Sequence, residues 1–268
     1  MSLFTGRNPV LNIAHRGGAG ERPESTLEAF HHALTVGADV LELDVHLTGD
    51  NQLIVSHDED LLRVSGDPGR VSELSVEEIR GADAGALWTD EKGERPFLGK
   101  GLTLPTLEEL FDSLPQAQMN VDIKSDAPLA AELTLSLIRR FDRADRTVVA
   151  SFLPSQLKRI RSAAPEITTS AHPGDVRRFY FLTRLGLAGL SSRRIPYLQI
   201  PERHGDLTLL TPRFLKAAHS AGRSVHIWTV NEPADMRRLI RFGVDGIVTD
   251  YPSLLARELL GLSKGRSS

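Results

Sequence analysis

Eight short apolar segments, each followed by a helical pattern, recur along the chain. This alternation is typical of a parallel sheet covered by helices, and eight units predict an α/β fold of the (β/α)8 TIM-barrel type. An open doubly wound sheet is the alternative, but it needs a glycine-rich phosphate turn that Gly17-Gly18-Ala19-Gly20 resembles only loosely. The expected strands span residues 10–14, 40–45, 119–123, 147–151, 167–170, 196–200, 224–229 and 246–249.

Capping residues predict where several of the helices begin. A serine or threonine with a glutamate three residues later forms a capping box, and Ser25, Ser75 and Thr106 have this spacing. Asn231 lies just before Pro233 and is a further predicted cap.

The regular spacing breaks once, between Asp58 and Thr103. This stretch is rich in glycine and proline and has one convincing helix pattern, so we interpret residues 58–103 approximately as an insertion after the second strand region. Barrel insertions on this side lie over the active site, so a lid is one interpretation and an inert loop is the other. The 268 residues suit a single domain spanning 1–268, since such barrels run to about 250 residues.

Composition excludes several classes of protein. The chain has no cysteine, which excludes disulfides and thiolate sites, and its formal net charge of −3 comes without a basic stripe for nucleic acid. No apolar run approaches the roughly 20 residues of a membrane span, and the first residues lack the apolar core of a signal peptide. We therefore expect a cytoplasmic protein without a nucleic-acid partner or stable membrane insertion.

The segment Val40-Leu41-Glu42-Leu43-Asp44-Val45 carries two carboxylates inside an apolar run. Side chains alternate between the faces of a strand, so Glu42 and Asp44 point the same way and the leucines point the other. Adjacent buried carboxylates are costly without a partner, which indicates a metal, a bound base or a shared proton.

Other polar residues follow the ends of expected strands that are far apart in the sequence. Catalytic groups of barrel enzymes come from these strand ends, so we expect one site there. Its candidate residues are His15, Arg16, Glu42, Asp44, His57, Asp122, Lys124 and Trp228. Weaker candidates are Ser151, His172, Gln199 and His226, whereas His31, His32 and His219 are expected on helices, at the surface or in packing.

Two interpretations of the acids remain. Glu42 and Asp44 could pair with Arg16 and Lys124 in a structural ion cluster. Alternatively, with Asp122 as a third carboxylate, they would supply the oxygen ligands that Mg²⁺ or Ca²⁺ prefers, which is the interpretation we favour.

The chain also resembles the glycerophosphodiester phosphodiesterase family. The resemblance covers nearly the whole chain and is weakest between residues 127 and 222. It is carried by His15-Arg16-Gly17-Gly18, Pro23-Glu24-Ser25-Thr26-Leu27-Glu28-Ala29-Phe30, Gly37-Ala38-Asp39, Glu42-Leu43-Asp44-Val45, His57-Asp58, Asp122-Ile123-Lys124, Trp228-Thr229-Val230-Asn231 and Asp245-Gly246-Ile247-Val248-Thr249-Asp250.

The resemblance implies a metal-dependent TIM-barrel hydrolase with His15 and His57 as catalytic acid and base. It makes Glu42, Asp44 and Asp122 metal ligands, places Arg16 and Lys124 on the phosphate, and sets Trp228 against the substrate's carbon skeleton. Two positions depart from the family pattern: Ser25 stands where asparagine is common, and Asp122 where the longer glutamate is frequent.

The expected reaction is hydrolysis of a small glycerophosphodiester to glycerol 3-phosphate and an alcohol. The substrate's own neighbouring hydroxyl is a candidate nucleophile, because it is already positioned beside the phosphorus. One alternative is a lysophospholipase D or sphingomyelinase D-like enzyme, for which Phe179-Tyr180-Phe181-Leu182 could contact an acyl chain. Another is a barrel that binds phosphate compounds without cleaving them.

Overall fold

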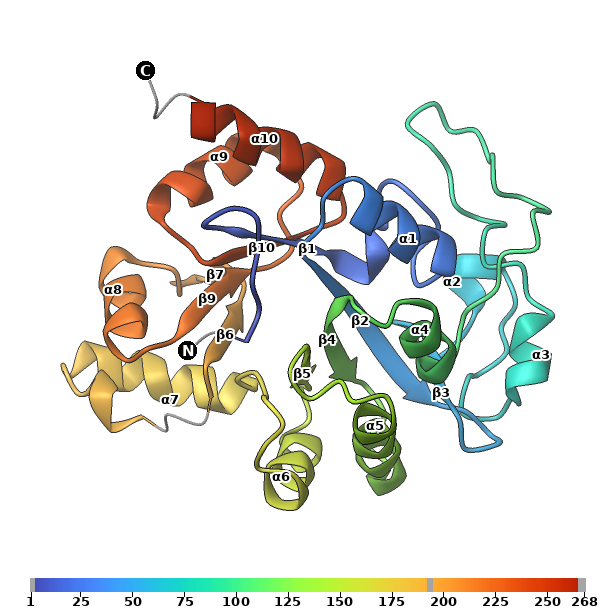
Figure 1. Cartoon of the computed structure of the whole chain (residues 1–268), viewed down its shortest axis with the longest axis horizontal. Coiled ribbons are helices and arrows are strands. Elements are labelled where there is room, and N and C mark those ends of the chain that lie inside the picture. Colours follow the sequence, from blue (N-terminus) through green and yellow to red (C-terminus); the bar gives the residue numbers. More distant parts are fainter. Residues whose placement is uncertain (1–2, 192–194, 265–268) are drawn as a thin grey trace.

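The computed structural model describes residues 3–191 and 195–264. Seven parallel strands form a sheet that curls around a central axis, in the order β5-β4-β2-β1-β10-β9-β6 (Figure 1). These strands are β1 (Leu11–Ala14), β2 (Val40–Leu47), β4 (Gln118–Ile123), β5 (Thr147–Ala150), β6 (Tyr197–Ile200), β9 (Ser224–Ile227) and β10 (Gly246–Thr249). The short β3 (Leu53–Val55) pairs antiparallel with the end of β2.

Residues 169–170 occupy the remaining position of the barrel. Thr169 forms a parallel bridge with Val149 of β5, and Ser170 forms one with Tyr197 of β6. The two edges of the seven-stranded sheet are thus joined, and the predicted (β/α)8 architecture is confirmed. The expected strand at 167–170 lies in its predicted place but is reduced to these two isolated bridges.

Helices follow the strands and surround the sheet (Figure 1). They are α1 (Leu27–Thr35), α4 (Leu107–Ser113), α5 (Pro128–Arg140), α6 (Pro154–Ala163), α7 (Pro173–Arg184), α8 (Pro212–Ser220), α9 (Pro233–Phe242) and α10 (Pro252–Lys264). Smaller elements are η1 (His15–Gly17), η2 (Ala188–Leu190) and a hairpin of β7 (Arg203–His204) and β8 (Leu207–Thr208). No helix in the described ranges is long and apolar enough to cross a membrane.

Strand β2 divides its side chains between two environments, as its alternation predicts. Leu41, Leu43 and Val45 are fully buried in the apolar layer between sheet and helices. The opposite face carries Glu42 and Asp44 toward the barrel axis. Polar side chains therefore concentrate inside the barrel, toward the carboxyl ends of its strands.

Apolar side chains fill the barrel near the amino ends of its strands. Phe4 packs on Tyr197 with ring centroids 5.3 Å apart, and the Tyr197 hydroxyl accepts hydrogen bonds from the backbone N–H groups of Leu3 and Phe4. His226 lies in this layer and is completely buried beside both rings. The N-terminal segment thus closes the barrel opposite the polar end.

Two predicted capping boxes are confirmed, at Ser75 for α3 (Val76–Arg80) and at Thr106 for α4. The predicted cap at Ser25 is wrong. Ser25 adopts a left-handed conformation with φ +59°, so the chain turns there and the helix begins one residue later. Thr26 caps α1 by accepting the backbone N–H of Ala29.

The predicted cap at Asn231 is also wrong. Glu232 occupies the N-cap position of α9 and makes no capping hydrogen bond with its side chain. The Asn231 amide is engaged elsewhere, because it donates to Oδ2 of Asp250 at 2.7 Å and accepts the Asp250 N–H. A side chain held by Asp250, directly after β10, is unavailable to cap α9.

The predicted insertion contains α2 (Leu62–Ser65), α3 and long connecting loops. Its apolar residues form a small cluster of their own over β3 that includes Leu61, Val71 and Ile79. In Figure 1 this segment lies beside the barrel, next to α1 and α4. The start of this segment places Asp58, and Arg63 of α2, at the polar end of the barrel.

Candidate active site

Three buried carboxylates lie on the adjacent strands β2 and β4. Asp44 is in register with Asp122, and Glu42 precedes Asp44 on the same face. Like charges side by side on neighbouring strands are destabilising. The Lys124 ammonium offsets this repulsion, since its Nζ lies 2.9 Å from Oδ1 of Asp44 and 2.8 Å from Oδ2 of Asp122.

Burial dominates the electrostatics of the acids. It raises the pKa of Glu42 to about 7, with a further contribution from the charge of Asp44. Burial also raises the pKa of Asp122 to about 6, although Lys124 opposes this shift. Asp122 and Asp44 in turn raise the pKa of Lys124 in spite of its burial, which keeps the ammonium charged. The surroundings of Glu42 and Asp122 therefore disfavour the charged forms of these two acids.

Arg16, in η1, connects the end of β1 to these acids. Its backbone N–H donates to Oε2 of Glu42 at 3.1 Å, and its Nε lies 3.7 Å from Oδ2 of Asp44. Its Nη1 donates to Oε1 of Glu24 at 3.1 Å. Glu24 thus holds the guanidinium beside the acidic cluster. In this position the guanidinium can bind an anionic group.

His15 is held by a carboxylate that directly follows the last strand of the barrel. Its Nδ1 lies 2.7 Å from Oδ1 of Asp250, which Asn231 fixes from the other side. Burial alone would lower the pKa of His15, but the hydrogen bond to Asp250 and the charge of Glu42 outweigh it, so this pKa is raised. With Nδ1 engaged, Nε2 is the ring nitrogen left for other chemistry.

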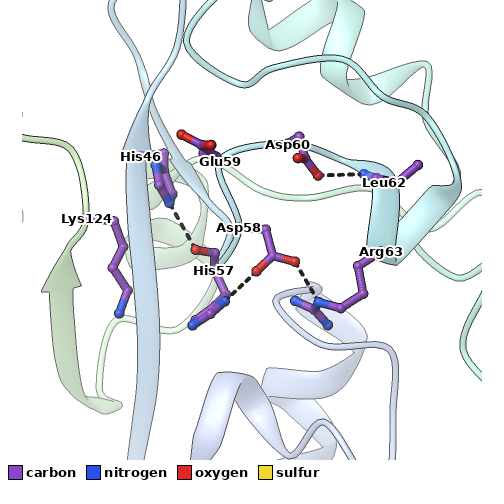
Figure 2. Close-up of a pocket in the computed structure, with 8 residues that line it drawn as sticks. All are labelled: His46, His57, Asp58, Glu59, Asp60, Leu62, Arg63 and Lys124. Carbon is purple, nitrogen blue, oxygen red and sulfur yellow. Dashed lines mark hydrogen bonds and ion pairs between the residues drawn. The ribbon is translucent and has the colours of Figure 1, made fainter.

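His57 has a similar arrangement, shown in Figure 2. Its Nδ1 lies 2.6 Å from Oδ1 of Asp58, and Nε of Arg63 donates to Oδ2 of the same carboxylate. Burial would raise the pKa of Asp58, but Arg63 and His57 lower it overall, so the group stays ionised. His46 contacts the backbone carbonyl of His57 through Nε2 at 3.0 Å.

Arg63 also contacts Glu24. Its two terminal nitrogens donate to the two carboxylate oxygens of Glu24, which is the partner of Arg16 described above. Arg63 therefore joins the carboxylate that orients His57 to the carboxylate that holds Arg16. We call the continuous chain His57, Asp58, Arg63, Glu24 and Arg16 the arginine relay.

A cavity of about 870 Å³ opens at this end of the barrel. The structure brings all eight principal site residues predicted from the sequence to its wall: His15, Arg16, Glu42, Asp44, His57, Asp122, Lys124 and Trp228. A second hollow of about 650 Å³ shares His57 and Lys124 and is also lined by His46, Glu59 and Asp60 (Figure 2).

Part of the wall of the large cavity is apolar. Phe152, in the loop after β5, packs edge-on against Trp228 with ring centroids 6.0 Å apart. Helix α7 and the β7–β8 hairpin complete this wall, with side chains that include Val176, Tyr180, Phe181, Leu207 and Leu209. The cavity wall therefore combines charged groups with a set of large apolar side chains.

Among the weaker candidates, Ser151, His172 and Gln199 line the cavity. His226 is not among its lining residues; it packs near Phe4 and Tyr197, as described above. The expectation for the helical histidines is confirmed, since His31 and His32 lie on α1 and His219 lies on α8.

Sequence reasoning gave no role to Glu24, Asp58, Arg63 or Asp250. A signal was available for two of them, because Asp58 directly follows His57 and Asp250 follows the last strand, where barrel sites are built. No comparable signal identifies Arg63, whose partner Glu24 is 39 residues away in the sequence.

The acids fit a hard divalent cation in the chemistry of their donor atoms. All three supply carboxylate oxygens, and Oδ2 of Asp44 and Oδ1 of Asp122 are buried without a hydrogen-bond partner in the described part of the chain. Within residues 3–191 and 195–264, no three acidic or histidine side chains converge as a ready-made metal site. The ammonium of Lys124 lies between Asp44 and Asp122 instead.

The contacts of the structural ion cluster are also present, because Lys124 and Arg16 both approach Asp44. These two contacts do not reach Glu42, whose partner is the uncharged backbone N–H of Arg16. A cation near Glu42 would counter the effects of burial and of the charge of Asp44, which together raise the pKa of Glu42. The two interpretations of the acids are therefore compatible.

Comparison with known proteins finds relatives along nearly the whole chain. Residues 15–254 match the profile of the glycerophosphoryl diester phosphodiesterase family. The probable glycerophosphodiester phosphodiesterase 2 of Mycobacterium tuberculosis is 34% identical over 93% of this chain and 90% of its own length. Human lysophospholipase D GDPD1 is 30% identical over 91% of this chain and 84% of its own length.

Solved structures of related proteins have the same fold. A putative glycerophosphoryl diester phosphodiesterase from Silicibacter pomeroyi superposes with a TM-score of 0.74 at 27% identity, covering 97% of this chain and 96% of the other. An Oleispira antarctica phosphodiesterase, solved with the product sn-glycerol-3-phosphate, gives a TM-score of 0.76 at 24% identity and covers 94% and 97% of the two chains.

Proposed function

The chain belongs to the glycerophosphoryl diester phosphodiesterase family, and we propose that it hydrolyses glycerophosphodiesters to glycerol 3-phosphate and an alcohol. One observation carries the proposal: His15 and His57, each held at Nδ1 by an aspartate, line one cavity with Arg16 and Lys124. Phosphodiester hydrolysis needs two proton-handling groups and cations around the phosphorus. The cavity offers both.

The histidines divide the proton transfers. One accepts the proton of the attacking hydroxyl, and the other donates a proton to the departing alcohol oxygen. Asp250 and Asp58 hold the rings at Nδ1 and stabilise them when they are positively charged. The paired aspartates thus support both the orientation and the charge that these transfers require.

The cationic side chains bind the phosphate. Arg16 presents a guanidinium whose position Glu24 fixes, and Lys124 presents an ammonium that stays protonated because of Asp44 and Asp122. Glu42, Asp44 and Asp122 are the residues that would hold Mg²⁺ or Ca²⁺, which when bound supplies further positive charge against the phosphate.

The attacking group in this proposal is the substrate hydroxyl on the carbon beside the phosphate ester. Its oxygen forms a bond to phosphorus while the bond from phosphorus to the alcohol oxygen breaks, which gives a cyclic phosphate. Water then opens the ring to glycerol 3-phosphate. Well-oriented intramolecular groups reach effective molarities of about 10⁵–10⁸ M, which favours this route over capture of a free nucleophile.

The apolar part of the cavity wall favours a second candidate substrate, a lysophospholipid cut at the same bond. In the aromatic stretch of α7, Phe179 is buried against Phe214, whereas Tyr180 and Phe181 line the cavity. A glycerol moiety that carries an acyl chain could place this chain along Tyr180, Phe181 and Phe152. The relatives named lysophospholipase D agree with this candidate.

Choline release from glycerophosphocholine and from lysophosphatidylcholine tests the proposal. Turnover of the first alone indicates a small-substrate enzyme, and a higher kcat/KM for the second indicates the lipid substrate. Calorimetric binding of either compound without any product would show that the barrel binds phosphodiesters without cleaving them, and the proposal would fail.

A further inference from the structure

Helix α7 presents an exposed face that combines arginines with large apolar side chains. Arg177, Arg178, Phe181, Arg184 and Leu185 are all exposed, at the spacing that places residues on one side of a helix. The opposite side carries buried residues that include Val176 and Phe179. The solvent face of this helix is therefore partly apolar, in contrast to the polar solvent face of an ordinary amphipathic helix.

Exposed apolar side chains are concentrated on and around this helix. Phe181 and Leu185 are 59% and 71% exposed, and on the following segment Leu187 and Leu190 are 45% and 68% exposed. Beside them, Phe152 and Leu207 are exposed at the mouth of the large cavity. Large apolar groups gathered in one region of a surface mark a site of interaction.

The charge of this region is positive although the chain as a whole is negative. From Arg177 to Leu190 the sequence contains three arginines and no acidic residue. None of these arginines forms an ion pair with an acid in the part of the chain that the structure describes. Arginines of this kind are available to an external anion.

We propose that this surface docks on an anionic lipid surface, with Arg177, Arg178 and Arg184 at the head groups and Phe181, Leu185, Leu187 and Leu190 in the interfacial layer. Basic amphipathic helices bind membranes in this way, because apolar burial adds to electrostatic attraction. We call these seven residues the α7 surface. The arginines favour an anionic partner over a neutral one.

The α7 surface is continuous with the mouth of the cavity, because Arg177 and Phe181 belong to both. A protein docked through it would hold the cavity mouth against the lipid layer. A lipid substrate could then enter without crossing water. The docking itself does not depend on which substrate is cleaved.

Cosedimentation with vesicles of phosphatidylcholine, with and without phosphatidylglycerol, tests the proposal. We expect binding to the anionic vesicles that weakens as salt is added. The double variant Leu185→Ser/Leu190→Ser should reduce partitioning at least about tenfold through lost apolar burial. Arg178→Glu should reduce it about tenfold or more, since each basic residue near the surface contributes roughly fivefold.

Matched controls come from elsewhere on the surface. Leu98→Ser removes another exposed leucine, from the insertion, and Arg159→Glu reverses an exposed arginine of α6. Both should bind vesicles like the wild type. Because Leu185, Leu190 and Arg178 do not line the cavity, their variants should also cleave soluble glycerophosphocholine at the wild-type rate.

Three results would overturn the proposal. The first is failure of the wild type to sediment with anionic vesicles, and the second is an equal loss of binding in the control variants. The third is a self-association seen by analytical ultracentrifugation that the same leucine substitutions abolish, which would make the surface an interface between two copies. Sedimentation measures binding to vesicles and does not depend on turnover. A failure of this docking proposal is therefore distinguishable from a failure of the proposed enzymatic function.

Discussion

Nε of Arg63 lies 2.6 Å from Oδ2 of Asp58, the aspartate that contacts His57. The same guanidinium contacts Glu24, the partner of Arg16. One side chain from the insertion therefore fixes two carboxylates, and each of these fixes a residue of the proposed active site. The insertion contributes to the site through this contact.

Arg63→Ala should lower kcat about 10- to 10²-fold, because displacing a reacting group by about 1 Å can cost 10²-fold. Arg63→Lys should recover little activity, since an ammonium lacks the planar fork that contacts both carboxylates. Steady-state kinetics on glycerophosphocholine, with thermal unfolding recorded in parallel, would measure both effects.

The control for this prediction is Arg70→Ala, which removes an insertion arginine paired with the exposed Glu59. It should leave kcat unchanged. If Arg63→Ala keeps the wild-type kcat, or loses activity only in proportion to a loss of folded protein, the arginine relay has no positioning role.

Asp250→Asn should shift the pH profile to lower pH. The carboxylate raises the pKa of His15 against the effect of burial, so its removal lets this pKa fall. Whether His15 acts as acid or base, the limb of the kcat/KM profile that it governs moves in the same direction. Asp245→Asn, which alters the exposed pair with His219 outside the cavity, should leave the profile in place. An unmoved limb in Asp250→Asn would exclude His15 as its origin.

His15→Ala and His57→Ala should each lower kcat roughly 10²- to 10⁴-fold, the usual range for loss of a general acid or base. The control is His31→Ala, on the exposed side of α1. His226→Ala would be unsuitable, because that histidine packs in the barrel interior. A folded His57→Ala protein with near-normal kcat would remove His57 from the mechanism.

Chelation should abolish turnover, and added Mg²⁺ or Ca²⁺ should restore it. The ion should also raise Tm, because a ligand that binds only the folded protein stabilises it. Glu42→Gln should reduce this rise in Tm, which differential scanning calorimetry can detect without any substrate. Full activity in chelator, with no metal found by elemental analysis, would leave the acids as a structural ion cluster.

A substrate that lacks only the hydroxyl next to the phosphate ester should be cleaved far more slowly than the parent compound. Losing an ordinary hydrogen bond costs about 1 kcal/mol, whereas losing an intramolecular nucleophile removes the reaction path. Rapid-quench samples of the parent should contain a transient cyclic phosphate. Similar kcat for both substrates would show that the nucleophile comes from outside the substrate.

The sequence predicts the barrel and the direction of its acids because both follow from local patterns. Alternation along β2 decides which way Glu42 and Asp44 point, and eight strand–helix units decide how the sheet closes. The connection between Arg63 and Glu24 has no such pattern, since it depends on where the insertion packs. The predicted caps at Ser25 and Asn231 were wrong for a related reason. The left-handed backbone of Ser25 and the tertiary contact of Asn231 overrode the local capping signal.

Lys124 has a consequence for how the protein matures. Many metal-binding domains cannot fold until the ion arrives, because the free energy of metal binding is needed to assemble their ligands. Here the ammonium between Asp44 and Asp122 is a counterion built into the chain itself. The barrel can therefore fold before the proposed metal ion binds, and in that proposal the supply of the ion would control when the enzyme works rather than whether it exists.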